Sequence, residues 1–599
     1  LARLEKMASL DDSDHFLVAA IDFGTTYSGY AFSFCSDPDE IKANKNWAKN
    51  QGYQSYKAPT SVLLTPKGRF EAFGFEAHER YNELFVKNSA DDYYFFDRFK
   101  MLLNPTEARE LGTRTLLKAA NGKSLPAVEV FAHTMRFLKQ HMINRILRDE
   151  ESAFEILEDD VLWVVTVPAI WDEAAKQFMR IAAERAGLAD KDDRHRLRIA
   201  LEPESASLFC LDFPQHFPGK LSDNQKLPLV AGTRYMVIDC GGGTADITVH
   251  EVRPDKSIRE IHCATGGPWG GTRVDENFYK VMDEIFGQEF MARYRQQYPS
   301  EWLDMCRAFD FKKRPSAPLV SLSILFNLTN FHRIVKKSDI KQSVEESKWA
   351  QKGVTFSNGY LHLTNKVMEE LFHPVVTRIV EHLECLMELE SLTNIGYFFL
   401  VGGFSESPIL QKAIKDRFSP QVCVLVPEEA GLAVMKGAVM FGHRPFSVTE
   451  RVIPKTFGIQ CSCEYDVKKH KGGSFHLDPS KLRLICSDAF FKCVEINKSI
   501  STKHGIRYLF HPTRSDQSKA EIRLFSTYGK DANLVTEAGM EHCGNILLSM
   551  PGVDEGKERE IEIVFFFGDT DVSVDAIDLI SKTKASVTIN FLDNNLRSV

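Results

Sequence analysis

Two similar segments, far apart along the chain, constrain the fold more than any other feature of the sequence. Residues 21–30 read IDFGTTYSGY and residues 238–247 read IDCGGGTADI. Each sets Asp, Gly and Thr between two stretches with the apolar character of β-strands, expected at 16–21 and 29–34 and again at 235–238 and 247–252. Asp239 repeats the position of Asp22. The repetition predicts two similar halves, each of which brings one strand–turn–strand unit to a shared site.

The residue types in the two turns are typical of phosphate binding. Glycine permits unusual backbone angles and lets a ligand approach the backbone closely. Thr25, Thr26 and Thr244 add hydroxyl donors to exposed N–H groups, and such nests of donors bind phosphate oxygens. Asp22 would repel phosphate unless a hard cation such as hydrated Mg²⁺ lay between them. A plain hairpin would explain the first turn alone, but the pair of turns predicts a clamp around one magnesium-bound polyphosphate.

A third glycine site follows another strand-like run. Residues 397–408 read YFFLVGGFSESP, which predicts a strand that ends at Gly402 and Gly403 and a helix with Ser407 at its N-cap and Pro408 at its first position. A double glycine there would let a flat group lie against the backbone, although a simple strand-to-helix connection is the alternative. The chain has neither a complete G-x-x-x-x-G-K-[ST] loop nor a G-x-G-x-x-G turn after a first strand, which excludes these two nucleotide sites.

Bulk properties exclude several other classes of protein. The net charge of −8 argues against nucleic acid as a partner, and no apolar run reaches the roughly 18–20 residues of a membrane span. Twelve cysteines in 599 residues are too few for a disulfide scaffold, and the lone C-x-C of Cys461 and Cys463 favours free thiols over a metal site. Residues 1–10 lack the apolar core of a signal peptide, so a reducing, cytoplasmic location is expected.

These motifs, in this order, resemble the ATPase shared by actin, sugar kinases and the seventy-kilodalton heat-shock proteins. Residues 427–439, PEEAGLAVMKGAV, resemble the last motif of that superfamily. The segments VTVPAIWDEAAKQFMRIAAERAGL at 165–188 and LEPESASL at 201–208 favour the heat-shock branch, and the details are most similar to its divergent twelfth subfamily. The resemblance covers about 16–444. It implies an α/β, two-lobed actin-like fold that binds ATP or ADP with Mg²⁺.

The resemblance also implies roles for individual residues. The catalytic set would be Asp22, Lys100, Glu202 and Asp239, with Glu202 near the attacking water and Lys100 near the phosphates, although Phe99 shifts the spacing of that lysine from the family pattern. The hydrated metal would be held by Asp22, Asp239 and Asp246. The phosphates would be bound by Gly24, Thr25, Thr26, Tyr27, Gly241, Gly242, Gly243 and Thr244. The adenosine would be covered by Lys313 and Arg314, with Gly402, Gly403 and Ser405 on the opposite wall.

Plainer roles exist for several of these residues. Glu202 could simply end a strand, Lys100 could be a surface lysine beside the aromatic residues at 93–96, and Asp246 could cap a turn. Lys313 and Arg314 could form a solvated basic turn.

The composition changes near residue 445. Before it, helical runs at 128–148 and 366–389 accompany the strands, whereas 520–526, 559–567, 571–577 and 585–591 alternate with period two. We therefore expect an N-terminal tail at 1–15, a nucleotide-binding domain at 16–445 and a β-sandwich-like domain at 446–599. The helical lid of the chaperone family is not evident after Phe567, and 446–453 is polar and basic where the family has an acidic, leucine-rich linker. The resemblance therefore does not by itself imply that a lid controls peptide capture in this chain. It also does not by itself imply that the nucleotide state controls the release of substrate.

Three functions follow as hypotheses. The first is an ATP-binding, chaperone-like stress protein that hydrolyses ATP slowly and binds polypeptide clients through a lidless β domain. The second is a nucleotide-regulated scaffold with negligible hydrolysis, whose β domain recruits a folded partner. The third is a small-molecule kinase, which is disfavoured because no aspartate base facing a sugar site is evident.

Overall fold

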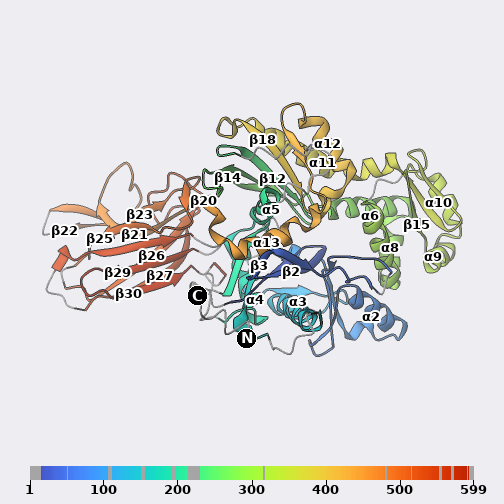
Figure 1. Ribbon diagram of the computed structural model, residues 1–599, viewed down its shortest axis with the longest axis horizontal. Helices are drawn as coiled ribbons and strands as arrows, with labels where there is room; N and C mark the ends of the chain where they lie inside the picture. Colours follow the sequence, from blue (N-terminus) through green and yellow to red (C-terminus); the bar gives the residue numbers. More distant parts are fainter. Residues whose placement is uncertain are drawn as a thin grey trace.

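The computed structural model describes most of the chain. The described residues are 15–49, 52–104, 111–149, 156–190, 196–212, 230–314, 318–478, 482–514, 516–551, 556–567, 572–589 and 591–592. Two sheets lie one above the other in Figure 1, and a β-rich part (red) lies beside them at one end of the molecule.

The sheet of the first lobe combines an antiparallel meander with two parallel strands. Its order is β11-β10-β1-β2-β3, with β4 paired to β2. The strand β1 is antiparallel to β2 and parallel to β10, which is parallel to β11. The strands are β1 (Leu17–Phe23), β2 (Tyr27–Phe34), β3 (Asp37–Ala43), β4 (Ala58–Pro59), β10 (Val161–Val167) and β11 (Leu197–Leu201).

The sheet of the second lobe repeats this plan. Its order is β19-β18-β12-β13-β14-β20-β24, and its first five strands have the same relative directions as β11-β10-β1-β2-β3. The prediction of two similar halves is therefore confirmed. The strands are β12 (Arg234–Cys240), β13 (Ala245–Val252), β14 (Ile258–Gly267), β18 (Ile395–Val401), β19 (Cys423–Leu425), β20 (Val448–Val452) and β24 (Ser499–Ser501).

Helices cover both faces of each sheet, which is why the central strands are apolar on both sides. Leu17 and Ala19 face a core with α3 and α4, whereas Val18 and Ala20 face a second core with α5 and α13. Figure 1 shows α5 and α13 between the two sheets. A β-carbon at Gly437 of α13 would lie 1.8 Å from the carbonyl oxygen of a residue of α5, so these two helices meet backbone to backbone. The helices are α3 (Ala127–Asp149), α4 (Glu173–Arg185), α5 (Glu202–Asp212), α11 (Asn365–Met387), α12 (Pro408–Phe418) and α13 (Ala433–His443).

Each lobe also carries an addition at the outer end of the cleft. The first lobe adds the sheet β6-β5-β7, the hairpin β8-β9 and α2, and the second adds the sheet β15-β17-β16 and α6 to α10. The elements are β5 (Ser61–Leu64), β6 (Phe70–Phe73), β7 (Tyr94–Asp97), β8 (Leu116–Lys118), β9 (Ser124–Pro126), α2 (Gly74–Val86), α6 (Thr272–Phe286), α7 (Gln288–Gln297), α8 (Pro299–Lys312), α9 (Phe326–Lys336), α10 (Ile340–Glu346), β15 (Leu319–Ser323), β16 (Val354–Ser357) and β17 (Tyr360–Thr364).

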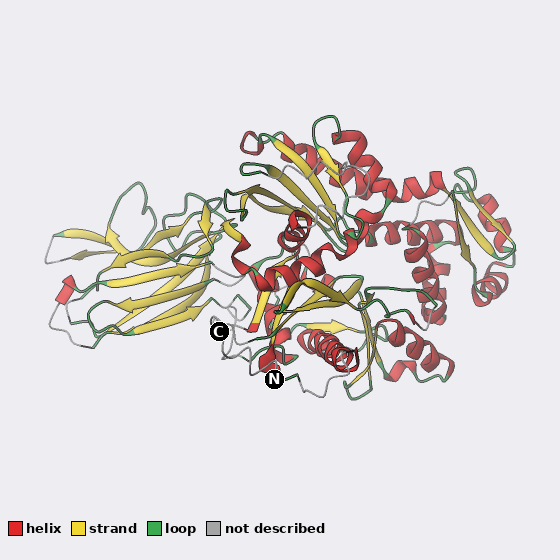
Figure 2. Cartoon of the chain, in the orientation of Figure 1, coloured by secondary structure: helices red, strands yellow, loops and turns green. Residues whose placement is uncertain are grey.

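The C-terminal part consists of two antiparallel sheets around one apolar core (Figure 2, yellow strands at the left). The first sheet, in spatial order, is β22 (Phe475–Asp478), β23 (Arg483–Val494), β21 (Thr456–Glu464), β26 (Lys519–Thr527) and β27 (Glu541–Ser549). The second is β25 (Ile506–Phe510), β28 (Ile561–Phe566), β29 (Ser573–Asp578) and β30 (Lys584–Thr588). The four segments predicted from period-two alternation coincide with β26, β28, β29 and β30. Within the described residues after 447, the one helical element is the short 3-10 helix η11 (Gly556–Glu558).

The segment that joins the two parts, residues 446–453, contains a strand, and its charged residues are one acid and one base, Glu450 and Arg451, so the expectation of a basic segment is wrong. Within it β20 runs parallel to β14 of the second lobe and pairs on its other side with β24, which comes from the C-terminal part. The Arg451 guanidinium donates from Nε and Nη2 to the two carboxylate oxygens of Glu204 at 2.8 and 2.7 Å, and both side chains are largely buried. The Val452 N–H donates to the Glu260 carboxylate at 2.8 Å, and burial raises the pKa of that carboxyl group to about 8. This connection is held by the backbone pairing of β20, by the buried side chains of Val448 and Ile453, and by the ion pair of Arg451 with Glu204.

We predict that Arg451→Ala lowers the free energy of unfolding by about 3 kcal/mol, because it leaves the buried carboxylate of Glu204 without its cation. Arg253→Ala is the matched control, since Arg253 pairs with Glu450 on the same strand while 39% of its side chain is exposed. That change should cost at most about 1 kcal/mol. Urea denaturation of both variants measures the difference, and equal losses would contradict the prediction.

Candidate nucleotide site

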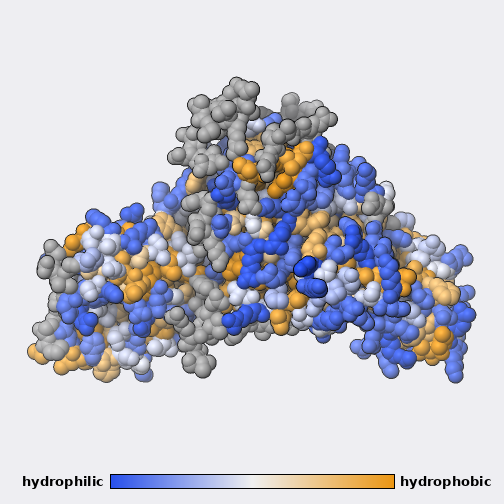
Figure 3. All heavy atoms as spheres, turned by 90° about the horizontal axis from the view of Figure 1, so that it is seen from below, coloured by the Kyte–Doolittle hydropathy of each residue, from blue (hydrophilic) through white to orange (hydrophobic). Residues whose placement is uncertain are grey.

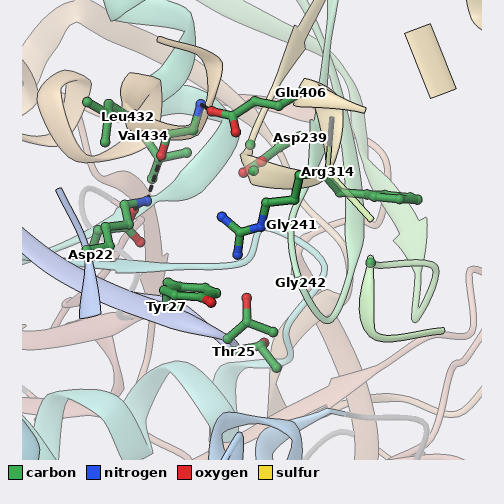
Figure 4. A pocket seen from close by; sticks show the side chains of 18 of the residues that line it. Asp22, Thr25, Tyr27, Asp239, Gly241, Gly242, Arg314, Glu406, Leu432 and Val434 are labelled. Atoms are coloured by element: carbon green, nitrogen blue, oxygen red, sulfur yellow. Dashed lines mark hydrogen bonds and ion pairs between the residues drawn. The ribbon is translucent and has the colours of Figure 1, made fainter. Parts of the chain in front are cut away.

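The two glycine-containing turns face each other across a cleft between the lobes. A β-carbon at Gly242 would lie 2.4 Å from Thr26 Oγ1, and one at Gly243 would lie 2.6 Å from Thr25 Oγ1. The turns therefore approach so closely that side chains in the second turn would not fit. Both turns line a cavity of about 410 Å³, into which Figure 4 looks. The structure brings together the two segments whose repetition the sequence shows.

Three of the predicted acidic site residues, Asp22, Asp239 and Glu202, line this cavity, whereas the predicted metal ligand Asp246 does not line it: it is buried and accepts a hydrogen bond from the Ile170 N–H at 3.0 Å. Asp22 is near the end of β1, Asp239 near the end of β12, Asp246 near the start of β13, and Glu202 begins α5. Burial, together with the neighbouring carboxylates, raises the pKa of Asp239 well above its usual range. Burial also raises the pKa of Asp246, and it raises that of Glu202 to about 7 against the opposing effect of Lys100. Without a cation these buried carboxyl groups therefore favour their protonated forms, and a cation beside them would stabilise the charged forms.

These carboxyl groups fit a hydrated divalent ion better than an ion that three protein side chains ligate directly. The part of the chain that the structure describes contains no group of three His, Cys, Asp or Glu side chains arranged as metal ligands, so Asp22, Asp239 and Asp246 do not form a three-carboxylate centre. Magnesium usually keeps several waters and binds one or two carboxylates together with substrate phosphates. The raised pKa values of Asp239 and Asp246 are those expected where such an ion would be stabilising.

Lys100 and Glu202 form a buried ion pair beside the turns. Lys100 lies in the 3-10 helix η3 (Phe99–Leu103), is 2% exposed, and places Nζ 2.7 Å from Glu202 Oε1 and 5.0 Å from the centre of the Trp171 ring. It is therefore no surface lysine, despite the shifted spacing. Glu202 begins a helix rather than merely ending a strand. Both residues of the pair line the cavity.

The outer end of the cavity is closed by contacts between the lobes. The Tyr27 hydroxyl donates to Asp310 Oδ2 at 2.8 Å, and the Arg314 guanidinium lies 4.5 Å from the centre of the Tyr27 ring (Figure 4). Lys313 is buried and donates to the Gly271 carbonyl oxygen at 3.0 Å, and it also pairs with the carboxylates of Asp275 and Asp310. Burial opposes ionisation of Asp310, yet these cations hold its pKa well below the usual range. Lys313 and Arg314 are thus part of the cleft and not a solvated turn.

The third glycine site borders the same cavity. Gly402 has a φ of 85°, and a β-carbon there would lie 2.3 Å from Asp239 Oδ1. Gly403 opens the 3-10 helix η8 (Gly403–Glu406), in which Ser405 is fully buried. Ser407 and Pro408 occupy the predicted N-cap and first position of α12, but the Ser407 hydroxyl makes no capping hydrogen bond.

Several residues of the site carry no motif that a sequence search would find. Asp310 and Asp275 pair with predicted cations, and Glu406 accepts a hydrogen bond from the Gly431 N–H at 3.2 Å. Lys57 is the least expected, because its Nζ lies 2.5 Å from Asp22 Oδ2 and 2.7 Å from the Gly431 carbonyl oxygen. These contacts join segments that are distant in sequence, so no local spacing signals them.

We predict that Gly402→Ala weakens ATP binding at least tenfold, because the new methyl group would displace Asp239 and strain the backbone at positive φ. Gly403→Ala is the control, since nothing lies within 4 Å of a β-carbon there. Calorimetric titration with ATP compares the two variants. Equal affinities would show that the approach of Gly402 to Asp239 does not matter for binding.

Known proteins resemble this chain over nearly its whole length. Heat shock 70 kDa protein 12B of Homo sapiens is 35% identical over 644 residues, which cover 96% of this chain and 91% of that protein. Heat shock 70 kDa protein 12A of Homo sapiens is 32% identical over 646 residues, with 98% and 93% covered. A chaperone protein HscA homolog of Bordetella petrii is 25% identical over 445 residues, with 72% and 59% covered. No protein-family model matches the chain. None of the helices in the described residues is long and apolar enough to cross a membrane.

Proposed function

The chain belongs to the heat shock 70 kDa protein family, in the branch of proteins 12A and 12B, and from that membership we propose that it is an ATP-binding, chaperone-like protein. It binds ATP or ADP with Mg²⁺ in the cleft between its lobes and hydrolyses ATP slowly. The observation that carries the proposal is the contact of Thr25 and Thr26 with Gly242 and Gly243, next to buried carboxyl groups whose pKa values are raised. We propose that residues 16–445 carry the nucleotide site and 446–599 the polypeptide site, although β20 and β24 of the latter range lie in the sheet of the second lobe.

The proposed role of each site residue follows from its position in the cleft. Backbone N–H groups of the two turns, with the hydroxyls of Thr25, Thr26 and Thr244, bind the phosphate oxygens. Mg²⁺, when bound, neutralises phosphate charge next to Asp22, Asp239 and Asp246. Lys100 stabilises the charge that develops on the transferred phosphoryl group, and Glu202, 2.7 Å from Lys100, orients the attacking water. Arg314 and Lys313 border the adenosine side of the cleft, opposite Gly402 and Gly403, whereas Ser405 is fully buried and does not line the cavity.

A single-turnover ATPase assay tests the hydrolysis. We expect Glu202→Gln to bind ATP but to hydrolyse it about 100-fold more slowly, because the amide cannot accept a proton from the water. The wild-type rate should rise as the pH increases through about 7, since Glu202 acts only when ionised and its pKa is raised to about 7. Glu40→Gln, at an exposed site on the surface, is the control. If wild type consumes no more ATP than Glu202→Gln, the chain is a nucleotide-regulated scaffold with negligible hydrolysis.

The C-terminal part offers an apolar edge for a polypeptide segment. The strand β22 is at the edge of its sheet, and Phe475, Leu477 and Leu484 lie on one face of the β22–β23 pair, each more than 40% exposed. Orange patches are visible on this part of the molecule in the space-filling view (Figure 3, left). An extended apolar peptide can add to such an edge through backbone hydrogen bonds while its side chains contact the apolar face. A lid is not needed for this mode of binding.

We predict that Leu477→Glu weakens binding of a fluorescein-labelled apolar heptapeptide at least tenfold, because it places a charge in the apolar face. Leu547→Glu is the control, since Leu547 is 64% exposed on β27 at the opposite edge of the same sheet. Fluorescence anisotropy measures both. A loss with Leu547→Glu and none with Leu477→Glu would place the peptide elsewhere.

A further inference from the structure

One lysine enters the cleft that neither the motifs nor the proposed mechanism uses. Lys57 lines the cavity, and its Nζ lies 2.5 Å from Asp22 Oδ2 and 2.7 Å from the carbonyl oxygen of Gly431. Asp22 belongs to β1, and Gly431 to the 3-10 helix η9 (Ala430–Leu432), whose Ala430 carbonyl oxygen accepts the Gly402 N–H at 2.9 Å. The lysine thus connects the first phosphate-binding turn with the opposite wall of the cavity.

The local structure fixes this side chain in place. Lys57 directly precedes β4, where Ala58 pairs with Ser28 and Pro59 with Tyr27. Its stem passes over Gly29, where a β-carbon would lie 3.0 Å from Lys57 Cγ. The side chain is 18% exposed and that of Asp22 is 6% exposed, so the ion pair is not a mobile contact on the surface.

The ion pair makes the two predicted metal aspartates unequal. Asp22 is bound on Oδ2 by Lys57 and accepts the Thr166 hydroxyl on Oδ1 at 3.2 Å. Asp239, in contrast, forms no ion pair with any described residue, although the charge of Lys57 acts on it as well and opposes the effect of burial and of the neighbouring carboxyl groups on its pKa. The positive charge expected from a metal at Asp22 is therefore already present as an ammonium group, whereas Asp239 has no comparable partner among the described residues.

An ammonium group carries three N–H donors. The bonds to Asp22 and Gly431 use two of them, and the third can reach a ligand because Lys57 lines the cavity. We propose that Lys57 binds the polyphosphate of the nucleotide directly, so that the cleft retains ATP when Mg²⁺ is removed. The proposal rests on the proposed nucleotide-binding function. Lys57 is a phosphate-binding residue that acts in addition to the metal.

Titration of the full-length chain with a fluorescent ATP analogue, once with Mg²⁺ and once with EDTA, tests this proposal. Wild type should bind in EDTA with a Kd within about tenfold of its value in Mg²⁺. Lys57→Met keeps the apolar stem and should still bind in Mg²⁺, but in EDTA its affinity should fall at least tenfold below that of wild type. Lys57→Arg, which retains the charge, should recover part of the binding in EDTA. Lys45→Met removes an exposed lysine from the same segment and should behave as wild type.

The outcomes separate this proposal from the proposed function. Wild type that binds in Mg²⁺ but not in EDTA, or Lys57→Met that equals wild type in EDTA, overturns the role of Lys57 and leaves nucleotide binding intact. Absence of binding under both conditions overturns the nucleotide site and the role of Lys57 together. Circular dichroism and the melting temperature of Lys57→Met without nucleotide establish that the variant is folded, so a loss of binding is not a loss of structure.

Discussion

The contact between the two turns requires a particular arrangement of the two sheets and of the helices between them. Thr26 can lie against Gly242 only if β1–β2 and β12–β13 end at the same place and point toward each other. Two sheets whose five corresponding strands follow the same order meet this requirement. The helices α5 and α13 lie between the sheets and set the distance from one sheet to the other. Since Gly437 brings these helices together backbone to backbone, the depth of the cleft depends on the same close packing that holds the lobes.

Electrostatics inside the cleft follows from this arrangement. Four carboxylates brought together by the ends of two hairpins and the start of α5 would repel one another without cations. The chain provides Lys57 for Asp22 and Lys100 for Glu202, and it leaves Asp239 and Asp246 with raised pKa values. The asymmetry between the two halves is therefore chemical as well as structural: Asp22 is paired with a lysine, whereas burial and neighbouring carboxyl groups raise the pKa of Asp239.

The local parts of this picture could be predicted from the sequence, and the long-range parts could not. The turns, the strands of the C-terminal part and the helices at 128–148 and 366–389 follow from residue types and periods within short windows, and the structure has α3 and α11 at nearly those bounds. The contact of Lys57 with Asp22 and that of Tyr27 with Asp310 join segments that are distant in sequence. The periodicity of residues within a short window therefore cannot predict them. For the same reason the composition of 446–453 indicated only a departure from the family linker, because Glu204, which pairs with Arg451, lies on a helix that is distant in sequence.

Helix α5 relates the two ends of the molecule. Its first residue, Glu202, pairs with Lys100 in the nucleotide cleft, and two residues later Glu204 pairs with Arg451 on β20. A helix turns by about 100° per residue, so residues two apart point to nearly opposite sides, and one rigid turn can serve two sites. A shift of α5 that accommodates a phosphate beside Glu202 must also move the carboxylate that anchors β20. One helix thus contacts both the cleft and β20, which pairs on its other side with β24 from the C-terminal part.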